Sequence, residues 1–279
     1  MYSRYFILSI AKIISVILLS LLTQILHTDY SAAQDNSLKE TEKFKIANNR
    51  VKKTNIYLDG TKITSVLYDT LGNRIKEENF SNDGTISNVT QFIYNSSGLL
   101  TEEINMLDDS TIVNRFIFYY NEAGNKIRTD KYNYENLYDG GIQYKYSDSV
   151  KPEEVHFLDK EDNITNKYEY KYDSENNLTE MKIYENGTLE SIIEFSPDEN
   201  KRTEKIAEFD SDMKIISSIT YEYDSGGNPL YITVRESSDV IYSIEIFIYD
   251  DNHLITEKNI DLSGDNTIDT KYFYEYEYY

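Results

Sequence analysis

The stretch "YEYDSGGN" at residues 221–228 decides the fold, because variants of it recur along the chain. An aromatic residue followed by Asp, Asn or Ser stands at positions 68, 94, 120, 146 and 172, which are 26 residues apart. A fixed period of this size indicates one supersecondary unit repeated in tandem, and repeated positions are more often scaffold than catalytic positions. We call these aromatic residues anchors. They are Tyr68, Tyr94, Tyr120, Tyr146, Tyr172, Phe195, Tyr223 and Tyr249.

Each anchor is predicted to end a strand. The residue two positions earlier, such as Val66 or Phe92, is apolar or aromatic, so period-two spacing places it on the same face as the anchor. A Gly or Asn recurs four residues after the anchor, and both residue types tolerate the positive φ of a tight turn. A second strand follows and ends in a bulky residue such as Phe80. Positive φ is therefore predicted at the turn glycines Gly72, Gly98, Gly124 and Gly227.

The repeats predict one all-β domain over residues 55–279, built from about eight tandem antiparallel β-hairpins. "IYLDGTKITSVLYD" at residues 56–69 aligns without a gap on "IYENGTLESIIEFS" at residues 183–196, so the first half-unit begins near Asn55. Sequential hairpins form an antiparallel meander, and a sheet of this length twists or coils into a spiral. The sequence leaves open whether the sheet closes on itself.

The phrase Y-x-Y-D-x-x-G-N resembles the YD repeat of bacterial Rhs-type proteins. It is complete at residues 221–228, and "YKYDSENN" at residues 170–177 has Asn in place of Gly. The resemblance covers the repeat array, residues 55–279. It implies hairpins that build a long spiral β-sheet, which in the large family members encloses a toxin domain. We expect a short version without a toxin domain, so the resemblance bears on the fold more than on the function.

Residues 1–33 are predicted to be a secretory signal peptide. Arg4 and Lys12 give a positive flank, residues 13–22 are apolar or Ser, and residues 31–33 are small enough for cleavage. An uncleaved anchor is the alternative, but the apolar stretch is shorter than the roughly 20 residues of a spanning helix. Export to the periplasm, cell surface or medium is expected, with no membrane span in the mature chain. The polar residues 34–54 are expected to form a charged linker, with a short helix as the alternative.

Composition excludes several classes of function. The formal net charge of −21 opposes binding to nucleic acid or to anionic lipid. The absence of cysteine excludes thiol catalysis, disulfides and Cys-based zinc sites. Beyond the predicted signal peptide, only His156 and His253 remain, and they fall in different repeats. Adjacent glutamates recur at equivalent positions of several repeats, which indicates a solvated strand face rather than a pair of catalytic acids. We therefore expect no enzymatic activity.

The segment "DLSGDNTIDTKY" at residues 261–272 resembles a calcium loop in its spacing, because oxygen-bearing side chains occupy its odd-numbered positions. However, Asn266 stands where such a loop has Gly, and Tyr272 stands where it has a bidentate Glu. An Asp-rich hairpin turn is the favoured interpretation, and calcium is the alternative. No other cofactor is expected. The candidate calcium ligands are Asp261, Ser263, Asp265 and Asp269.

The chain has 27 tyrosines, which are densest in residues 271–279. Cross-strand packing explains tyrosine on a sheet, whereas exposed tyrosine offers a stacking surface for sugars or peptides. The predicted function is a non-catalytic binding or scaffold module at the cell envelope, with carbohydrate or protein as ligand. A purely structural spacer or shell component is the alternative. An outer-membrane β-barrel is a third hypothesis, which charges on both faces of residues 73–80 oppose. The candidate ligand-binding residues are Tyr272, Tyr274, Tyr276 and Tyr278.

Overall fold

The repeats fold into consecutive antiparallel hairpins. A computed structural model describes residues 35–147, 151–237 and 239–279, with side chains from residue 41 onward. The predicted signal peptide, residues 1–33, lies outside the described residues. Helix α3 (Asp35–Asn48) precedes the strands. The strands are β1 (Val51–Leu58), β2 (Thr61–Tyr68), β3 (Arg74–Phe80), β4 (Ile86–Tyr94), β5 (Leu100–Leu107), β6 (Ile112–Tyr120), β7 (Lys126–Asn133), β8 (Tyr138–Lys145), β9 (Glu154–Leu158), β10 (Ile164–Tyr172), β11 (Leu178–Glu185), β12 (Thr188–Pro197), β13 (Thr203–Asp210), β14 (Ile215–Tyr223), β15 (Pro229–Glu236), β16 (Ile241–Tyr249), β17 (Ile255–Asp261) and β18 (Thr270–Tyr278).

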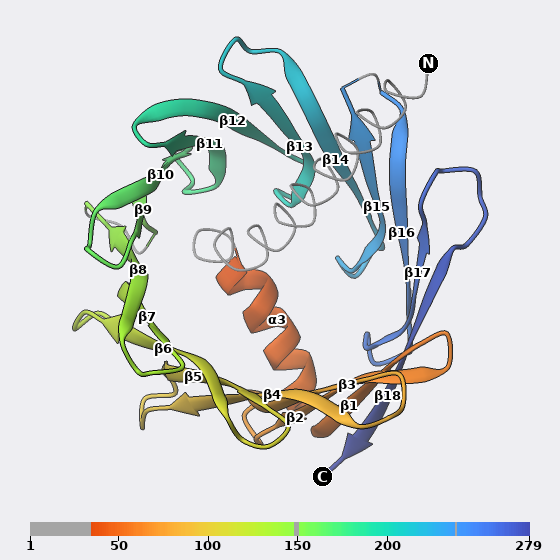
Figure 1. Cartoon of the computed structure of the whole chain (residues 1–279). Coiled ribbons are helices and arrows are strands. Elements are labelled where there is room, and N and C mark those ends of the chain that lie inside the picture. Colours follow the sequence, from red (N-terminus) through yellow and green to blue (C-terminus); the bar gives the residue numbers. More distant parts are fainter. Residues whose placement is uncertain (1–34, 148–150, 238) are drawn as a thin grey trace, which may run out of the picture. The chain divides into compact units, whose positions relative to one another are not determined.

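These strands form one 18-stranded sheet that closes on itself (Figure 1). Each strand pairs antiparallel with the next, and β1 pairs with both β2 and β18. At the closing seam, Thr54 in β1 lies opposite Val66 in β2 and opposite Tyr276 in β18. The all-β fold of tandem hairpins is therefore confirmed. The question of closure, which the sequence left open, is answered by a β-barrel.

The closed sheet has two faces because side chains alternate along each strand. The inner face carries the anchors and the residues two positions before them. Most of the buried apolar side chains of the strands lie on this face, including Val66, Ile193 and Ile219, which are at most 6% exposed. Ile46, near the end of α3, is buried against it and joins a cluster with Val51, Val66, Tyr68 and Leu254. The face that was predicted to be buried is therefore the inner face.

The outer face is polar over most of the ring. At the position before the anchor, Lys145, Lys171 and Glu222 are exposed, as are the apolar or aromatic Ile93, Tyr119 and Ile248. Ion pairs join side chains on this face, as between Lys182 and Glu180 at 3.7 Å. Further outer-face pairs are Lys76–Glu78, Arg115–Glu102, Arg128–Asp130, Lys145–Glu154 and Lys167–Glu169. Exposed apolar side chains gather on β4 and β6, where Ile93, Val113 and Tyr119 are 39–43% exposed.

Each residue of the YD phrase has a structural role. The anchor hydroxyl donates to a carbonyl in the preceding unit, as from Tyr120 to Leu100 at 2.6 Å. The following Asp caps the turn, because Oδ1 of Asp69 accepts the amides of Leu71 and Asn73 at 2.9 Å. The predicted positive φ is confirmed at Gly72, Gly98, Gly124 and Gly227, with values of 79–86°. The same tyrosine–carbonyl bond is made by Tyr94, Tyr146, Tyr172, Tyr223 and Tyr249.

One anchor was assigned to the wrong residue. β12 continues to Pro197, and the turn begins at Asp198, whose Oδ1 accepts the amides of Asn200 and Arg202. Pro197 therefore occupies the anchor position, and Phe195 is the buried residue two positions before it. Positive φ consequently falls on Lys201. The aromatic–Ser pair at residues 195–196 mimicked an anchor, whereas the capping carboxylate sets where the turn begins.

The start of the array also differs from the prediction. Residues 35–48 of the expected linker form α3, which is rich in the good helix formers Lys and Glu, and the burial of Ile46 stabilises the end of the helix. β1 begins at Val51 rather than near Asn55. The 18 strands therefore make nine hairpins, one more than the repeat phrase indicated.

Candidate functional site

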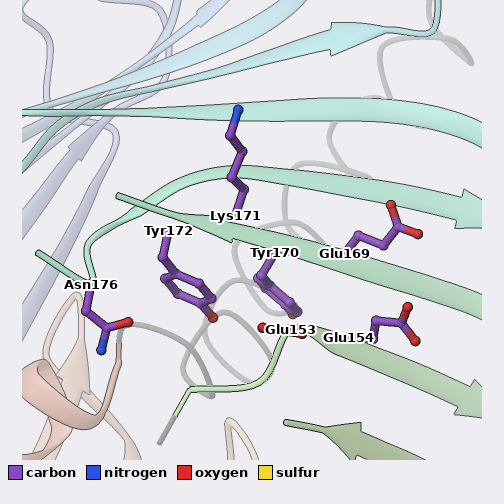
Figure 2. A pocket seen from close by; sticks show the side chains of 7 residues that line it. All are labelled: Glu153, Glu154, Glu169, Tyr170, Lys171, Tyr172 and Asn176. Carbon is purple, nitrogen blue, oxygen red and sulfur yellow. The ribbon is translucent and has the colours of Figure 1, made fainter. Parts of the chain in front are cut away.

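A pocket of about 540 Å³ opens where β9 begins, beside the end of β10 (Figure 2). β9 has five residues, whereas every other described strand has at least seven. The paired register ends with Glu154 opposite Glu169, and the Tyr170 amide then donates to the Glu153 carbonyl. The end of β10 therefore extends past its shorter neighbour. The pocket is lined by Glu153, Glu154, Glu169, Tyr170, Lys171, Tyr172 and Asn176.

Two tyrosines of β10 contribute aromatic surface to this pocket. Figure 2 shows the rings of Tyr170 and Tyr172 on one side of the strand and Lys171 on the other. The Tyr172 hydroxyl donates to the Pro152 carbonyl at 2.8 Å, and the Lys151 ammonium lies 5.6 Å from the ring centroid. Burial raises the pKa of Tyr172. The ring is thus a neutral surface held in a fixed position.

The carboxylates of the pocket are held by a histidine and by lysines. An oxygen of Glu154 lies 2.8 Å from Nε2 of the buried His156 and 3.3 Å from Nζ of Lys145. Burial works to raise the pKa of Glu154, but the hydrogen bonds from His156 and Lys145 outweigh it and the pKa is lowered. The hydrogen bond from Lys167, at 2.5 Å, lowers the pKa of Glu169. Both carboxylates are therefore ionised at neutral pH.

A second pocket, of about 470 Å³, lies by the turn that follows β16 and includes Tyr249, Asp250 and His253. Its polar groups already have partners near the end of α3. Asn228 donates to Asp224 at 2.7 Å, lies 3.0 Å from Nδ1 of His253, and accepts a hydrogen bond from Lys45 at 2.5 Å. This cluster joins the helix to the turns, and its polar side chains already bond to one another.

The predicted calcium residues use their oxygens within their own turn. Asp261 is 2% exposed, and its carboxylate accepts the amides of Ser263, Gly264 and Asn266 at 2.7–3.0 Å. Asp265 accepts the amide of Thr267, and Asp269 accepts that of Leu262. The backbone bond from Ser263 is the main cause of the lowered pKa of Asp261. An Asp-rich turn accounts for these contacts, and calcium binding stays an untested alternative.

The predicted ligand-binding tyrosines do not form one exposed stripe. Tyr272, Tyr274 and Tyr276 lie half-buried on the inner face of β18. Tyr276 packs against the Ile46 cluster, and its hydroxyl donates to the Ile255 carbonyl at 2.7 Å. Tyr278, at the end of β18, is 51% exposed. Packing accounts for Tyr276, while a ligand role for the other three stays a prediction.

A polar cluster that breaks the repeat surrounds Arg128. Its guanidinium bonds to Asp130 at 2.5 Å and to Asp162 at 2.9 Å, and Asp162 also accepts the Tyr138 hydroxyl at 2.5 Å. Gly141 leaves room for this cluster, because a Cβ there would lie 3.2 Å from the Tyr138 hydroxyl and 3.3 Å from Oδ1 of Asp130. These groups bond to one another and brace the irregular strands. Over residues 35–147, 151–237 and 239–279, no group of three or more acidic or His residues could hold a metal ion.

Sequence reasoning missed the β9–β10 pocket. The signal was present in "YSDSVKPEEV" at residues 146–155, where the expected turn Gly is missing and Pro152 interrupts the strand pattern. Proline cannot donate to the backbone bonds between strands, and the paired residues of β9 begin at Glu154, just after Pro152. Among the described helices, none is long and apolar enough to span a membrane.

Comparisons with known proteins found no matching family model and no matching curated protein. Among solved structures, a porin-like protein from Bacteroides uniformis is 11% identical, with a TM-score of 0.44 over 81% of this chain and 98% of that one. A porin-like protein from Bacteroides vulgatus is 11% identical, with a TM-score of 0.35 over the same shares. The TcdB2-TccC3 structure is 12% identical, with a TM-score of 0.24 over 75% of this chain and 16% of that chain. Likeness at this level does not extend to function.

Proposed function

We propose that this chain is a non-catalytic binding barrel that works in water at the cell envelope, with carbohydrate or protein as its ligand. The polarity of the outer face is the observation that carries the proposal. Lys and Glu pairs occupy the middle of the outer face of several strands, as in β3, β10 and β11. A Lys or Arg facing lipid at the bilayer midplane costs about 2–4 kcal/mol, so such a surface favours water.

Within the described residues, the polar side chains that could take part in catalysis are bonded to one another, which supports a binding role over catalysis. The unusual polar cluster at Arg128 is paired within itself, and both histidines beyond the predicted signal peptide already contact polar partners. The open pocket at the β9–β10 junction combines aromatic rings with hydrogen-bonding side chains, which is the composition of many small-molecule binding sites. Hydrolase activity that survives purification and is lost on changing one pocket residue would contradict this proposal.

The experiment is a phase partition followed by binding assays on the exported chain. In Triton X-114, a water-facing barrel is expected in the aqueous phase, and recovery in the detergent phase would overturn the proposal. The aqueous protein is then applied to glycan and peptide arrays. Saturable binding to either array is the expected result. No binding on both arrays, together with assembly into larger particles, would favour the purely structural role.

An outer-membrane barrel is the second candidate, and two observations favour it. Closed barrels with an even number of antiparallel strands are the form that spans outer membranes, and this sheet has 18. In β16, the residues Ile244, Ile246 and Ile248 alternate on the outer face, and Ile248 is 44% exposed. Detergent-phase recovery, with a shift in gel mobility on heating, would select this candidate.

A further inference from the structure

Building on the proposed binding function, we propose that the pocket at the β9–β10 junction binds an uncharged saccharide. Three properties of its lining point to this ligand class. They are aromatic rings beside the opening, hydrogen-bonding groups of both kinds, and a local charge close to zero.

The aromatic surface comes from the end of β10. Tyr170 and Tyr172 lie on the same side of the strand (Figure 2), and Tyr172 offers the accessible ring, because Tyr170 is 7% exposed. Sugar rings carry apolar C–H faces, and tyrosine is a rigid, amphipathic surface for such a face. The bond from the Tyr172 hydroxyl to the Pro152 carbonyl fixes this ring before any ligand arrives. Binding therefore loses little side-chain entropy at Tyr172.

The charges of the pocket balance. Glu153, Glu154 and Glu169 offer carboxylate acceptors, and Lys171 offers ammonium donors. Lys145 and Lys167 pair with two of the glutamates, and Lys151 lies over the Tyr172 ring. Three negative groups thus stand among four positive ones, so neither an anion nor a cation is strongly favoured. Hydroxyl groups both donate and accept, and they can bond to carboxylates and ammonium groups alike.

The size and position of the pocket fit an oligosaccharide. Its volume of about 540 Å³ lies within the 300–1,000 Å³ typical of small-molecule sites. It lies where β9 stops short of the end of β10, so a chain of linked rings can enter from the open side. Glu154 and Glu169, opposite each other in the register, hold the end of the pocket nearest the paired strands.

The test is isothermal titration of the full exported chain with four uncharged hexasaccharides: cellohexaose, maltohexaose, mannohexaose and N-acetylchitohexaose. At least one is expected to bind saturably. Tyr172→Leu should weaken that binding at least tenfold, whereas Tyr172→Phe, which keeps the ring, should bind within threefold of the parent chain. Glu169→Gln should weaken binding, and the exposed outer-face control Glu222→Gln should not.

A matched control separates binding from folding. Tyr223 is an anchor like Tyr172, and its hydroxyl donates to the Thr203 carbonyl at 2.7 Å, but it lies outside the pocket. Tyr223→Leu therefore removes an equivalent structural bond and should leave saccharide affinity unchanged. Binding that both leucine variants retain would overturn the location while leaving the proposed function intact. Binding of peptides but of no saccharide would overturn the ligand class and keep the protein-binding form of the function.

Discussion

The wall from β4 to β7 repeats its contacts throughout, whereas the wall from β8 to β12 repeats them only in part: Tyr146 and Tyr172 keep the anchor bond, but other positions depart from the repeat. In the first region, Gly98 and Gly124 make the same turn, and Tyr120 makes the same hydroxyl bond as Tyr94. In the second region, β9 is short and Pro197 occupies an anchor position without a hydroxyl. The comparison teaches that the repeated residues hold the barrel together, and that a departure from the repeat leaves room for a pocket.

Raising the pH should break the contacts of the anchor hydroxyls, both inside the regular region and outside it, and give the largest effect. Burial raises the pKa of Tyr94, Tyr120, Tyr146 and Tyr223 to about 12. In the unfolded chain tyrosine titrates near pH 10, so the stability that these neutral tyrosines contribute is complete below pH 10. It is then lost as the pH rises toward 12. Phenolate absorbance at 295 nm and circular dichroism should change together in this window. Full ionisation near pH 10 with the fold retained would contradict the role of these hydroxyls.

Gly72 and Gly98 sharpen the comparison, because both have φ of 79° but only one has a close neighbour. A Cβ at Gly72 would lie 2.4 Å from the Lys43 carbonyl oxygen, whereas nothing lies within 4 Å at Gly98. Gly98→Ala should cost about 1–2 kcal/mol of backbone strain. Gly72→Ala should cost about 3–5 kcal/mol, because it also displaces the end of α3 and exposes Ile46. Urea unfolding measures both costs, and equal costs would show that the helix contact contributes nothing.

The anchor hydroxyl can be removed in the regular region and added in the irregular one. Tyr120→Phe should destabilise by about 1 kcal/mol, since the Leu100 carbonyl loses its partner. At residue 197 the comparison is between Pro197→Tyr and Pro197→Phe, which differ only in the hydroxyl. The Tyr variant should be the more stable by roughly 0.5–1 kcal/mol, through a bond to the Leu178 carbonyl. Identical unfolding midpoints for the two variants would show that this region cannot accept the repeated bond.

The smallest effect is expected at Glu208, on the inner face of β13. Burial raises its pKa, and its carboxylate accepts a hydrogen bond from Ser217 at 3.1 Å. Stability from the protonated form is complete below the ordinary glutamate pKa and is lost as the pH rises through the raised value. Glu208→Gln should therefore stabilise the barrel at pH 7 by on the order of 0.5–1 kcal/mol, with no gain at pH 4. A loss of stability at pH 7 would show that the charge itself is needed.

The local features could be predicted from sequence because they depend on residues near one another. The turn positions of Gly72 and Gly124 predicted positive φ, and the alternation of apolar residues around Val66 predicted the buried face. The capping role of Asp69 was missed, although it explains why Asp or Asn follows the anchor and why the turn at Asp198 shifts by two residues. These contacts span two to four residues, so they were within reach of the sequence.

Closure and the candidate site could not be predicted in the same way. At the seam Thr54 lies opposite Tyr276, and neither segment has a local sequence feature that predicts this pairing. The short β9 follows from how Pro152 limits pairing with β10, which depends on the register of both strands. Packing around Ile46 likewise depends on residues distant in the chain, including Leu254. Long-range pairing, rather than local propensity, fixes these features.

The bond from each anchor to the preceding unit has a consequence for the size of the barrel. It reaches back 20 residues, as from Tyr146 to Lys126, and so it never depends on how many units the ring contains. Gaining one whole unit would add two strands and widen the ring, while β1 and β18 would still meet antiparallel. Gaining a single strand would instead make those two strands parallel, and the hydrogen bonds of the seam would have to change their pattern. Gene duplication in steps of 26 residues is therefore a route by which barrels of this design can change diameter without redesign of any wall contact.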